Sequence, residues 1–184
     1  MSLIETHRRL LEQWRRTMNL VGPGPLQEHY DDADEVLRVL DNPTGHWADL
    51  GTGAGLPGII FAARFPSVAL DLVDSRQKRC VFVDQVLGSA DLSGHAERTV
   101  RCTRVEALPD HSYDGLISRA FAPPPKVLEH AARLLRPDGQ VVLLLMADAE
   151  VPDDDRFTVL AERRYQLPGR DARRAVLLQR VPDA

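Results

Sequence analysis

One stretch decides the fold of this chain: residues 47–58, which read WADLGTGAGLPG. A short apolar run enters a glycine-rich turn, and Pro57 then begins a helix, whose first turn tolerates proline. Glycine lets the backbone approach a ligand closely, and the free amides of a helix N-terminus favour an anionic or carboxylate-bearing group. The spacing Gly53-x-Gly55-x-x-Gly58 also matches the dinucleotide fingerprint, a weak indication when it stands alone. The stretch therefore predicts a strand, a ligand-binding turn and a helix in succession.

The next apolar run strengthens this interpretation. Residues 69–73 (ALDLV) predict a strand that ends at Asp74, about twenty residues after the glycines, where dinucleotide-binding folds carry an acidic side chain. A carboxylate at that position accepts hydrogen bonds from ribose hydroxyls. We therefore expect Gly51, Gly53, Gly55 and Asp74 to bind a cofactor.

From residue 46 onward, short apolar runs alternate with longer amphipathic ones, which predicts βαβ units, a parallel sheet and right-handed crossovers. The predicted strands are 47–50, 69–73, 99–103, 115–118 and 140–146, and the predicted helices are 57–65, 77–87 and 125–135. After an acidic loop at 148–155, residues 157–163 and 175–181 predict an antiparallel pair of strands. We expect an α/β fold with a mainly parallel, seven-stranded sheet.

The first 45 residues have a helical pattern instead. Apolar side chains at helical spacing predict an amphipathic helix over residues 3–18, and a second short helix follows at 28–40. The prolines and glycines of residues 21–25 (VGPGP) separate the two helices. No internal repeat or linker interrupts the sequence. We expect a single domain over 1–184, with a helical segment at 1–45 and a Rossmann-like core at 46–184.

Composition and charge exclude several classes of protein. With 184 residues, 43% of them hydrophobic, the chain is ample for one core and too short for two full-size domains. No run approaches the roughly 20 apolar residues of a membrane helix, and no signal peptide is recognisable. A net charge of -4 argues against an obligate nucleic-acid coat or a polybasic membrane binder. We expect a cytoplasmic protein with no membrane partner.

Two kinds of ligand suit a glycine turn followed by an acidic strand end: a nicotinamide or flavin dinucleotide, and S-adenosylmethionine. A dehydrogenase of this type needs a second half for nicotinamide and substrate, and here the predicted sheet is complete by residue 181. The pattern Asp49-x-Gly51-x-Gly53-x-Gly55, with the terminal strand pair, is typical of class I S-adenosylmethionine-dependent methyltransferases. A methyltransferase is therefore favoured over an oxidoreductase.

The sequence lacks residues that two classes of methyl acceptor require, the amino groups of bases and the ring carbon of cytosine. Amino-group methylation of adenine or guanine commonly uses an N-P-P-Y-like stretch after the fourth strand, where this chain has residues 118–121 (SRAF). Carbon methylation of cytosine needs a cysteine nucleophile, but Cys80 lies in a predicted helix and Cys102 in a predicted strand. Neither cysteine has metal-ligand spacing, and no metal is expected. Methylation of guanine N7 needs no general base, because N7 carries an unprotonated lone pair. The absence of an obvious acid–base pair in this sequence is consistent with that acceptor.

Several motifs together resemble one family. Residues 49–59 (DLGTGAGLPGI) look like the signature of the bacterial 16S rRNA guanine-N7 methyltransferases, the RsmG or GidB family. The other matching motifs are Trp14 with Asn19-Leu20, His29-Tyr30-Asp31-Asp32, Asp74-Ser75-x-x-Lys78-Arg79, Arg104-Val105-Glu106 and residues 114–121 (DGLISRAF). The resemblance spans nearly the whole chain, which is identified as a short, diverged member.

The resemblance implies S-adenosylmethionine as cofactor and 16S rRNA or the small ribosomal subunit as partner. No feature of the composition or periodicity marks a dimer interface, so we expect a monomer. It implies that Val105 and Glu106 flank the adenine and that Arg119, the candidate catalytic residue, reaches the cofactor or the target nucleotide. Phe121 could stack on a flipped base or anchor the loop from within. The predicted cofactor-binding residues are Asp49, Gly51, Gly53, Gly55, Leu56, Asp74, Ser75, Val105, Glu106 and Arg119.

The chain departs from the family after the predicted fifth strand. A Lys-Gly loop is replaced by residues 144–150 (LLMADAE) and three further aspartates, and an acidic loop weakens contacts with phosphate. Two groups of arginines, at 98–104 and 163–180, would bind RNA phosphates if they share a face with the strand ends. Two alternatives therefore stay open: a diverged methyltransferase acting on another RNA or a small molecule, and a non-catalytic module that binds S-adenosylmethionine.

Overall fold

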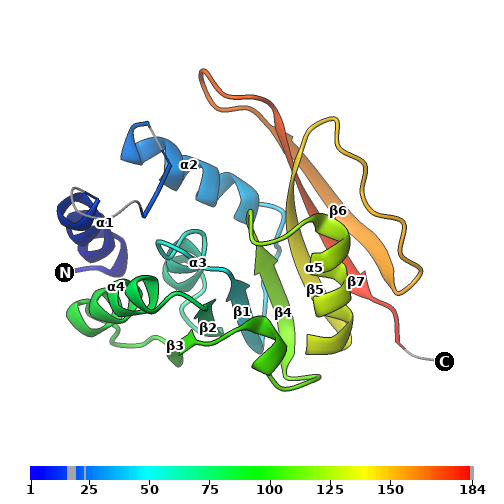
Figure 1. The fold of residues 1–184 in the computed structure, drawn as a ribbon, viewed down its shortest axis with the longest axis horizontal. Helices are drawn as coiled ribbons and strands as arrows, with labels where there is room; N and C mark the ends of the chain where they lie inside the picture. Colours follow the sequence, from blue (N-terminus) through cyan, green and yellow to red (C-terminus); the bar gives the residue numbers. More distant parts are fainter. Residues whose placement is uncertain (16–19, 23, 183–184) are drawn as a thin grey trace.

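A computed structural model describes residues 1–15, 20–22 and 24–182 of the chain (Figure 1). The first helix, α1 (Leu3–Trp14), is confirmed, although it ends earlier than the predicted 3–18; Met18 and the motif residue Asn19 lie outside the described residues. The Ser2 hydroxyl accepts the Glu5 amide at 3.4 Å and the Glu5 carboxylate accepts the Ser2 amide at 3.0 Å. This capping box fixes where α1 begins.

The remaining elements follow the predicted order. They are α2 (Leu26–Leu37), β1 (His46–Leu50), α3 (Gly58–Arg64), β2 (Ala69–Asp74), α4 (Gln77–Ser89), β3 (Arg98–Cys102), the 3₁₀ turn η1 (Val105–Ala107), β4 (Tyr113–Ser118), α5 (Pro124–Leu134), β5 (Leu135–Met146), β6 (Phe157–Tyr165) and β7 (Arg173–Arg180). Every predicted strand and helix is present, with ends shifted by a few residues. Pro57 caps α3 rather than beginning it.

The seven strands form one sheet in the order β3-β2-β1-β4-β5-β7-β6. Strands β1 to β5 are parallel, and β7 pairs antiparallel with both β5 and β6, which confirms the mainly parallel sheet with a terminal antiparallel pair. In the middle of the sheet Trp47 on β1 is opposite Gly115 on β4. A Cβ at Gly115 would come within 2.2 Å of the Trp47 ring, so only glycine fits there.

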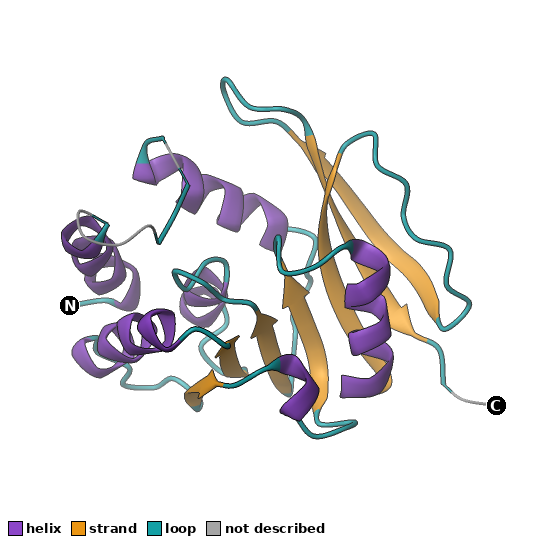
Figure 2. Ribbon diagram, in the orientation of Figure 1, coloured by secondary structure: helices purple, strands orange, loops and turns teal. Residues whose placement is uncertain are grey.

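Helices cover both faces of the sheet (Figure 2). Alternate strand residues point to opposite faces, so Trp47 joins a hydrophobic cluster with α1 to α4, whereas Ala48 joins a second cluster with α5. The N-terminal helices therefore share a core with the sheet, and the assignment of one domain stays a prediction. Within the described residues no helix is long and apolar enough to cross a membrane.

Candidate active site

The glycine-rich turn, residues 51–57 between β1 and α3, is held from below by Asp49. One oxygen of its buried carboxylate accepts the Thr52 hydroxyl at 2.6 Å and the Gly58 amide at 3.0 Å. Burial raises the pKa of Asp49 to about 6, against the two hydrogen bonds that favour its charged form. A Cβ at Gly58 would lie 2.6 Å from this carboxylate and 2.3 Å from Leu72. The close approach of α3 to β1 therefore requires glycine.

Asp74, at the end of β2, holds the same turn from the side. Its carboxylate accepts the amides of Gly53 at 3.0 Å and Arg76 at 2.9 Å, and the Arg79 guanidinium at 3.2 Å. The Thr52 amide also donates to the Val73 carbonyl at 2.9 Å. The turn is therefore fixed relative to β2 through both its backbone and the acidic side chain at the strand end.

Two adjoining cavities open at the carboxyl ends of the parallel strands, the edge at which doubly wound sheets bind ligands. The first, which we call the β3 cavity, has a volume of about 420 Å³. Its lining includes Gly51, Val73, Asp74, Ser75, Arg76, Arg79, Arg104, Val105, Glu106 and Phe121. Apolar side chains and carboxylates converge there, which suits a nucleoside.

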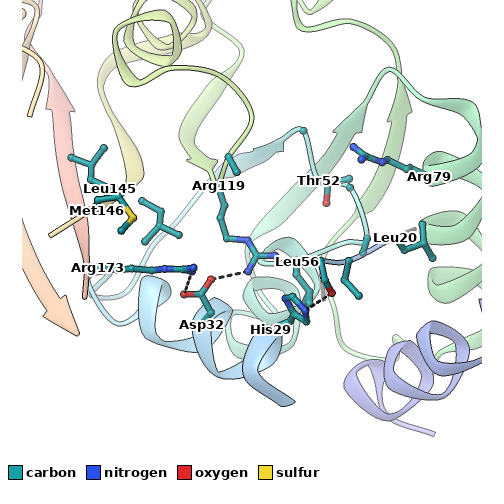
Figure 3. A pocket seen from close by; sticks show the side chains of 17 residues that line it. Leu20, His29, Asp32, Thr52, Leu56, Arg79, Arg119, Leu145, Met146 and Arg173 are labelled. Carbon is teal, nitrogen blue, oxygen red and sulfur yellow. Dashed lines mark hydrogen bonds and ion pairs between the residues drawn. The ribbon is translucent and has the colours of Figure 1, made fainter. Parts of the chain in front are cut away.

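The second cavity, which we call the α2 cavity, has a volume of about 470 Å³ and shares Gly51, Arg79 and Ala120 with the first. It extends from the glycine turn to α2, to the end of β5 and to the start of β7 (Figure 3). Its lining includes Leu20, His29, Asp32, Gly53, Ala54, Leu56, Arg119, Leu144, Leu145, Met146 and Arg173.

Asp32 organises the polar side of the α2 cavity. Its buried carboxylate binds the guanidinium of Arg119 at 3.0 Å and that of Arg173 at 2.6 Å, and it accepts the Tyr165 hydroxyl at 2.8 Å. Figure 3 shows Asp32 between the two arginines, with His29 beside it. Burial, reinforced by the neighbouring arginines, lowers the pKa of His29. Two guanidinium groups that share one carboxylate leave a net positive charge at this site. Such a site suits a hydrogen-bond acceptor or an anionic group of a ligand.

The structure brings most of the predicted cofactor-binding residues to these two cavities. Gly51, Gly53, Leu56 and Arg119 line the α2 cavity, and Gly51, Asp74, Ser75, Val105 and Glu106 line the β3 cavity. Asp49, beneath the turn, and Gly55, within it, line neither cavity, so their assignment to the cofactor stays a prediction. Phe121 lies against the turn: a Cβ at Gly51, whose φ is +70°, would be 2.7 Å from its ring.

Most arginines of the expected RNA-binding groups are engaged within the protein. Arg163 binds Glu35 at 2.8 Å, Arg170 binds Glu28 at 2.7 Å and Arg101 binds Asp71 at 3.0 Å. In the described part of the chain, Arg104 and Arg164 remain exposed with no hydrogen bond or ion pair to their side chains. The predicted basic surface is therefore much smaller than the arginine count suggests.

Both cysteines, Cys80 and Cys102, are free thiols. Cys80 is buried in α4, where burial raises its pKa to about 12, and Cys102 lies on β3. Neither thiol lines the β3 or the α2 cavity. A cysteine nucleophile therefore has no place in this site.

Some residues of the site carry no predicted role. Asp32 and His29 belong to a matching motif that implies no role for them, and the sequence predicts only RNA contact for Arg173. Tyr165 carries no sequence signal. Tyr165 and Arg173 reach Asp32 through the pairing of β6 and β7 with the rest of the sheet, a long-range relationship that local patterns do not report.

Comparison with protein families gives one match over nearly the whole chain. The model of the GidB family, rRNA small subunit methyltransferase G, matches residues 1–174. The ribosomal RNA small subunit methyltransferase G of Paracoccus denitrificans is 32% identical over 145 residues, which are 77% of this chain and 74% of the relative. That of Wolinella succinogenes is 31% identical over 88% of this chain and 86% of the relative. The alignment with the Hyphomonas neptunium enzyme is 37% identical but covers only 60% of that relative.

Solved structures of methyltransferases share the fold at low sequence identity. A predicted O-methyltransferase from Agrobacterium tumefaciens is 23% identical with a TM-score of 0.62, over 80% of this chain and 79% of that one. A geranyl diphosphate methyltransferase, solved with geranyl diphosphate and sinefungin, is 12% identical with a TM-score of 0.60, over 82% and 78%. The Rossmann-like methyltransferase fold expected from the glycine turn is thus confirmed.

Proposed function

This chain belongs to the rRNA small subunit methyltransferase G family, and on that premise we propose that it methylates N7 of a guanine in 16S rRNA, with S-adenosylmethionine as methyl donor. The observation that carries the proposal is the pair of adjoining cavities at the strand ends, joined at Gly51 on the glycine turn. One cavity suits the donor, and the other leaves room for an acceptor beside it.

The residues of the β3 cavity fit S-adenosylmethionine. Val105 and the exposed Glu106 would hold the adenine, and the carboxylate of Asp74 with the Ser75 side chain would hold the ribose. Gly53 offers open space: a Cβ built there would meet no atom closer than 3.7 Å, although its φ of +58° favours glycine. Leu56 and Arg119 would contact the remaining part of the cofactor, where guanidinium groups suit a carboxylate. When bound, S-adenosylmethionine supplies an electrophilic methyl carbon on a sulfonium sulfur.

The work of the protein is then to position the acceptor base. Guanine N7 carries an unprotonated lone pair, so no side chain has to remove a proton. Asp32 fixes the guanidinium groups of Arg119 and Arg173 in the lining of the α2 cavity. The N–H groups of Arg173, and those that Arg119 does not use for the cofactor, can donate to guanine O6 or to a phosphate. Leu145 and Met146 supply an apolar wall for the ring. Both cavities are lined by one chain, so we propose that the active unit is a monomer.

Contact with ribosomal RNA would come from the cations that remain free. Arg76 and Arg104 line the β3 cavity, Lys78 lies in the first turn of α4, and all three are exposed without an ion pair in the described residues. Phosphate contacts supply most of the affinity for nucleic acid. We place the enzyme with its substrate, the small ribosomal subunit or its RNA, in the cytoplasm.

The direct test is transfer of a labelled methyl group. Purified protein with labelled S-adenosylmethionine is incubated with 16S rRNA and small subunits that lack the modification, and with a small-molecule extract, and labelled RNA is cleaved by chemistry specific for 7-methylguanosine. We expect label in RNA at one guanine. Label only in small molecules would favour the diverged activity, and binding without any transfer would favour a non-catalytic module; either result overturns the proposal.

A further inference from the structure

A chain of buried polar groups joins both N-terminal helices to the glycine turn. His7, on α1, is fully buried; its Nδ1 lies 2.5 Å from the hydroxyl of Tyr30 on α2, and its Nε2 lies 2.6 Å from the carbonyl oxygen of Ala54. Ala54 belongs to the turn and lines the α2 cavity. The side chain of His7 therefore links the helical segment directly to the backbone of the predicted cofactor site.

The direction of both hydrogen bonds follows from their partners. A carbonyl oxygen can only accept, so Nε2 must carry the proton that is donated to Ala54. Burial lowers the pKa of His7 to about 4, so the ring is neutral at pH 7 and its Nδ1 accepts from the Tyr30 hydroxyl. The Ala54 carbonyl thereby fixes the tautomer of His7, and the Tyr30 hydroxyl donates to the ring nitrogen that remains.

Among the described residues, this contact is the one side-chain hydrogen bond to the turn that comes from outside the parallel strands. The side chain of Asp49 holds Thr52 and Gly58, and that of Asp74 holds Gly53, so β1 and β2 fix three positions. Ala54 lies between them, and its carbonyl is held by His7. A Cβ at Gly55 would be 3.4 Å from Nε2, so the ring also leaves little space for the turn to shift toward α1.

We propose that His7, held on its other side by the Tyr30 hydroxyl, is a positioning residue of the cofactor-binding turn, so that the N-terminal helices determine the affinity for S-adenosylmethionine. The inference rests on the proposed function, because it takes the turn as the binding site of that cofactor. The helical segment is then part of the cofactor site although none of its described side chains lines the β3 cavity.

The test compares three variants with the wild-type protein by calorimetry with S-adenosylmethionine and by methyl-transfer kinetics. His7→Leu removes the donor and should raise the Kd and the KM for the cofactor about 10- to 100-fold, with kcat at saturating cofactor little changed. His7→Gln restores a donor and should recover most of the affinity. Thr6→Val is the matched control: Thr6 is equally buried, and its hydroxyl has no partner in the described residues, so the Kd should not change.

A spectroscopic readout separates positioning from packing. Nitrogen NMR of the wild-type protein at pH 7 should show His7 neutral with the proton on Nε2. Tyr30→Phe should keep this tautomer, because the Ala54 carbonyl still requires it, and should give a smaller rise in Kd, because the ring loses the partner of Nδ1. If His7→Leu fails to fold, Tyr30→Phe tests the same link in a milder form. A Kd that stays at the wild-type value in folded His7→Leu or Tyr30→Phe, or a proton on Nδ1, overturns the inference; a wild-type protein that binds no cofactor overturns the proposed function itself.

Discussion

The guanidinium of Arg119 lies 3.0 Å from the carboxylate of Asp32, a residue 87 positions earlier in the chain. This ion pair joins the loop after β4 to α2, and the same carboxylate holds Arg173 from β7. Three distant segments thus converge on one buried acid beside the glycine turn. The side of the site that would receive the methyl acceptor depends on Asp32 more than on any single strand.

Asp32→Asn should impair both stability and methyl transfer. The amide has the size of the carboxylate but leaves two largely buried guanidinium groups without a counter-ion, which should cost about 2–4 kcal/mol of unfolding free energy. Methyl transfer should fall at least about tenfold, because Arg119 and Arg173 are no longer held in place. Asp31→Asn is the control: Asp31 is exposed, and within the described residues its carboxylate is bound only by the Gln27 side chain. Urea unfolding and transfer assays check both effects, and equal behaviour of the two variants contradicts the role of Asp32.

Reversing the charge of Arg104 should weaken binding to RNA. Its side chain is exposed beside the β3 cavity and free of ion pairs within the described residues. Arg104→Glu should lower the affinity and reduce the slope of log K against log salt by about 1. Arg164→Glu makes the same charge change at an exposed, unpaired arginine of β6, away from both cavities. Salt-dependent binding measurements that find equal losses in the two variants would exclude a footprint beside β3.

Two glycine-to-alanine substitutions should have opposite effects. Gly58→Ala brings a methyl group within 2.6 Å of the Asp49 carboxylate and 2.3 Å of Leu72, so the turn must shift and thermal stability should fall. At Gly88, on the exposed side of α4, a Cβ meets no atom within 4 Å. Gly88→Ala should therefore raise the free energy of unfolding by about 0.5–1 kcal/mol, because alanine has the higher helix propensity. Thermal unfolding of the two variants checks both signs, and a destabilised Gly88→Ala would contradict the geometry of α4.

Asp49 should make stability depend on pH in an unusual direction. Burial raises its pKa to about 6 from an ordinary value of 3.8, so the native state holds this proton more tightly than the unfolded state does. The free energy of unfolding therefore falls as pH rises through this window. When the pH is lowered from 7 to 4, the unfolding free energy of the wild-type protein should rise by about 2–3 kcal/mol relative to that of Asp49→Asn. Other titrating groups, His7 among them, are common to both proteins and cancel. A difference in urea midpoints that is independent of pH would show that Asp49 is not perturbed.

The sequence predicts those parts of the molecule whose signals are local. The glycine turn needs a short strand, three glycines and a helix start within a dozen neighbouring residues, and the structure has them in place. The alternation of apolar runs likewise predicts every strand from β1 to β7. Each of these patterns arises from residues that are close in the sequence as well as in the fold.

The parts that the sequence does not predict depend on long-range pairing. The pairs Arg163–Glu35 and Arg170–Glu28 form only because β6 and the loop after it lie beside α2, so their arginines are unavailable to RNA. The contact of His7 with Ala54 similarly crosses 47 positions. Nothing in the local composition of either partner indicates such a contact, because side-chain periodicity reports burial and not the identity of the neighbour.

The position of β7 between β5 and β6 has a consequence for synthesis. Among the described strands, β6 pairs only with β7. Because β6 precedes β7 in the chain, it stays unpaired until β7 has left the ribosome. The hydrogen bonds that hold the glycine turn come from β1, β2 and α1, whereas Asp32 gains Tyr165 and Arg173 only when β6 and β7 have joined the sheet. A nascent chain would thus secure the glycine turn early and the polar side of the α2 cavity last, and methyl transfer would begin only after the final pairing.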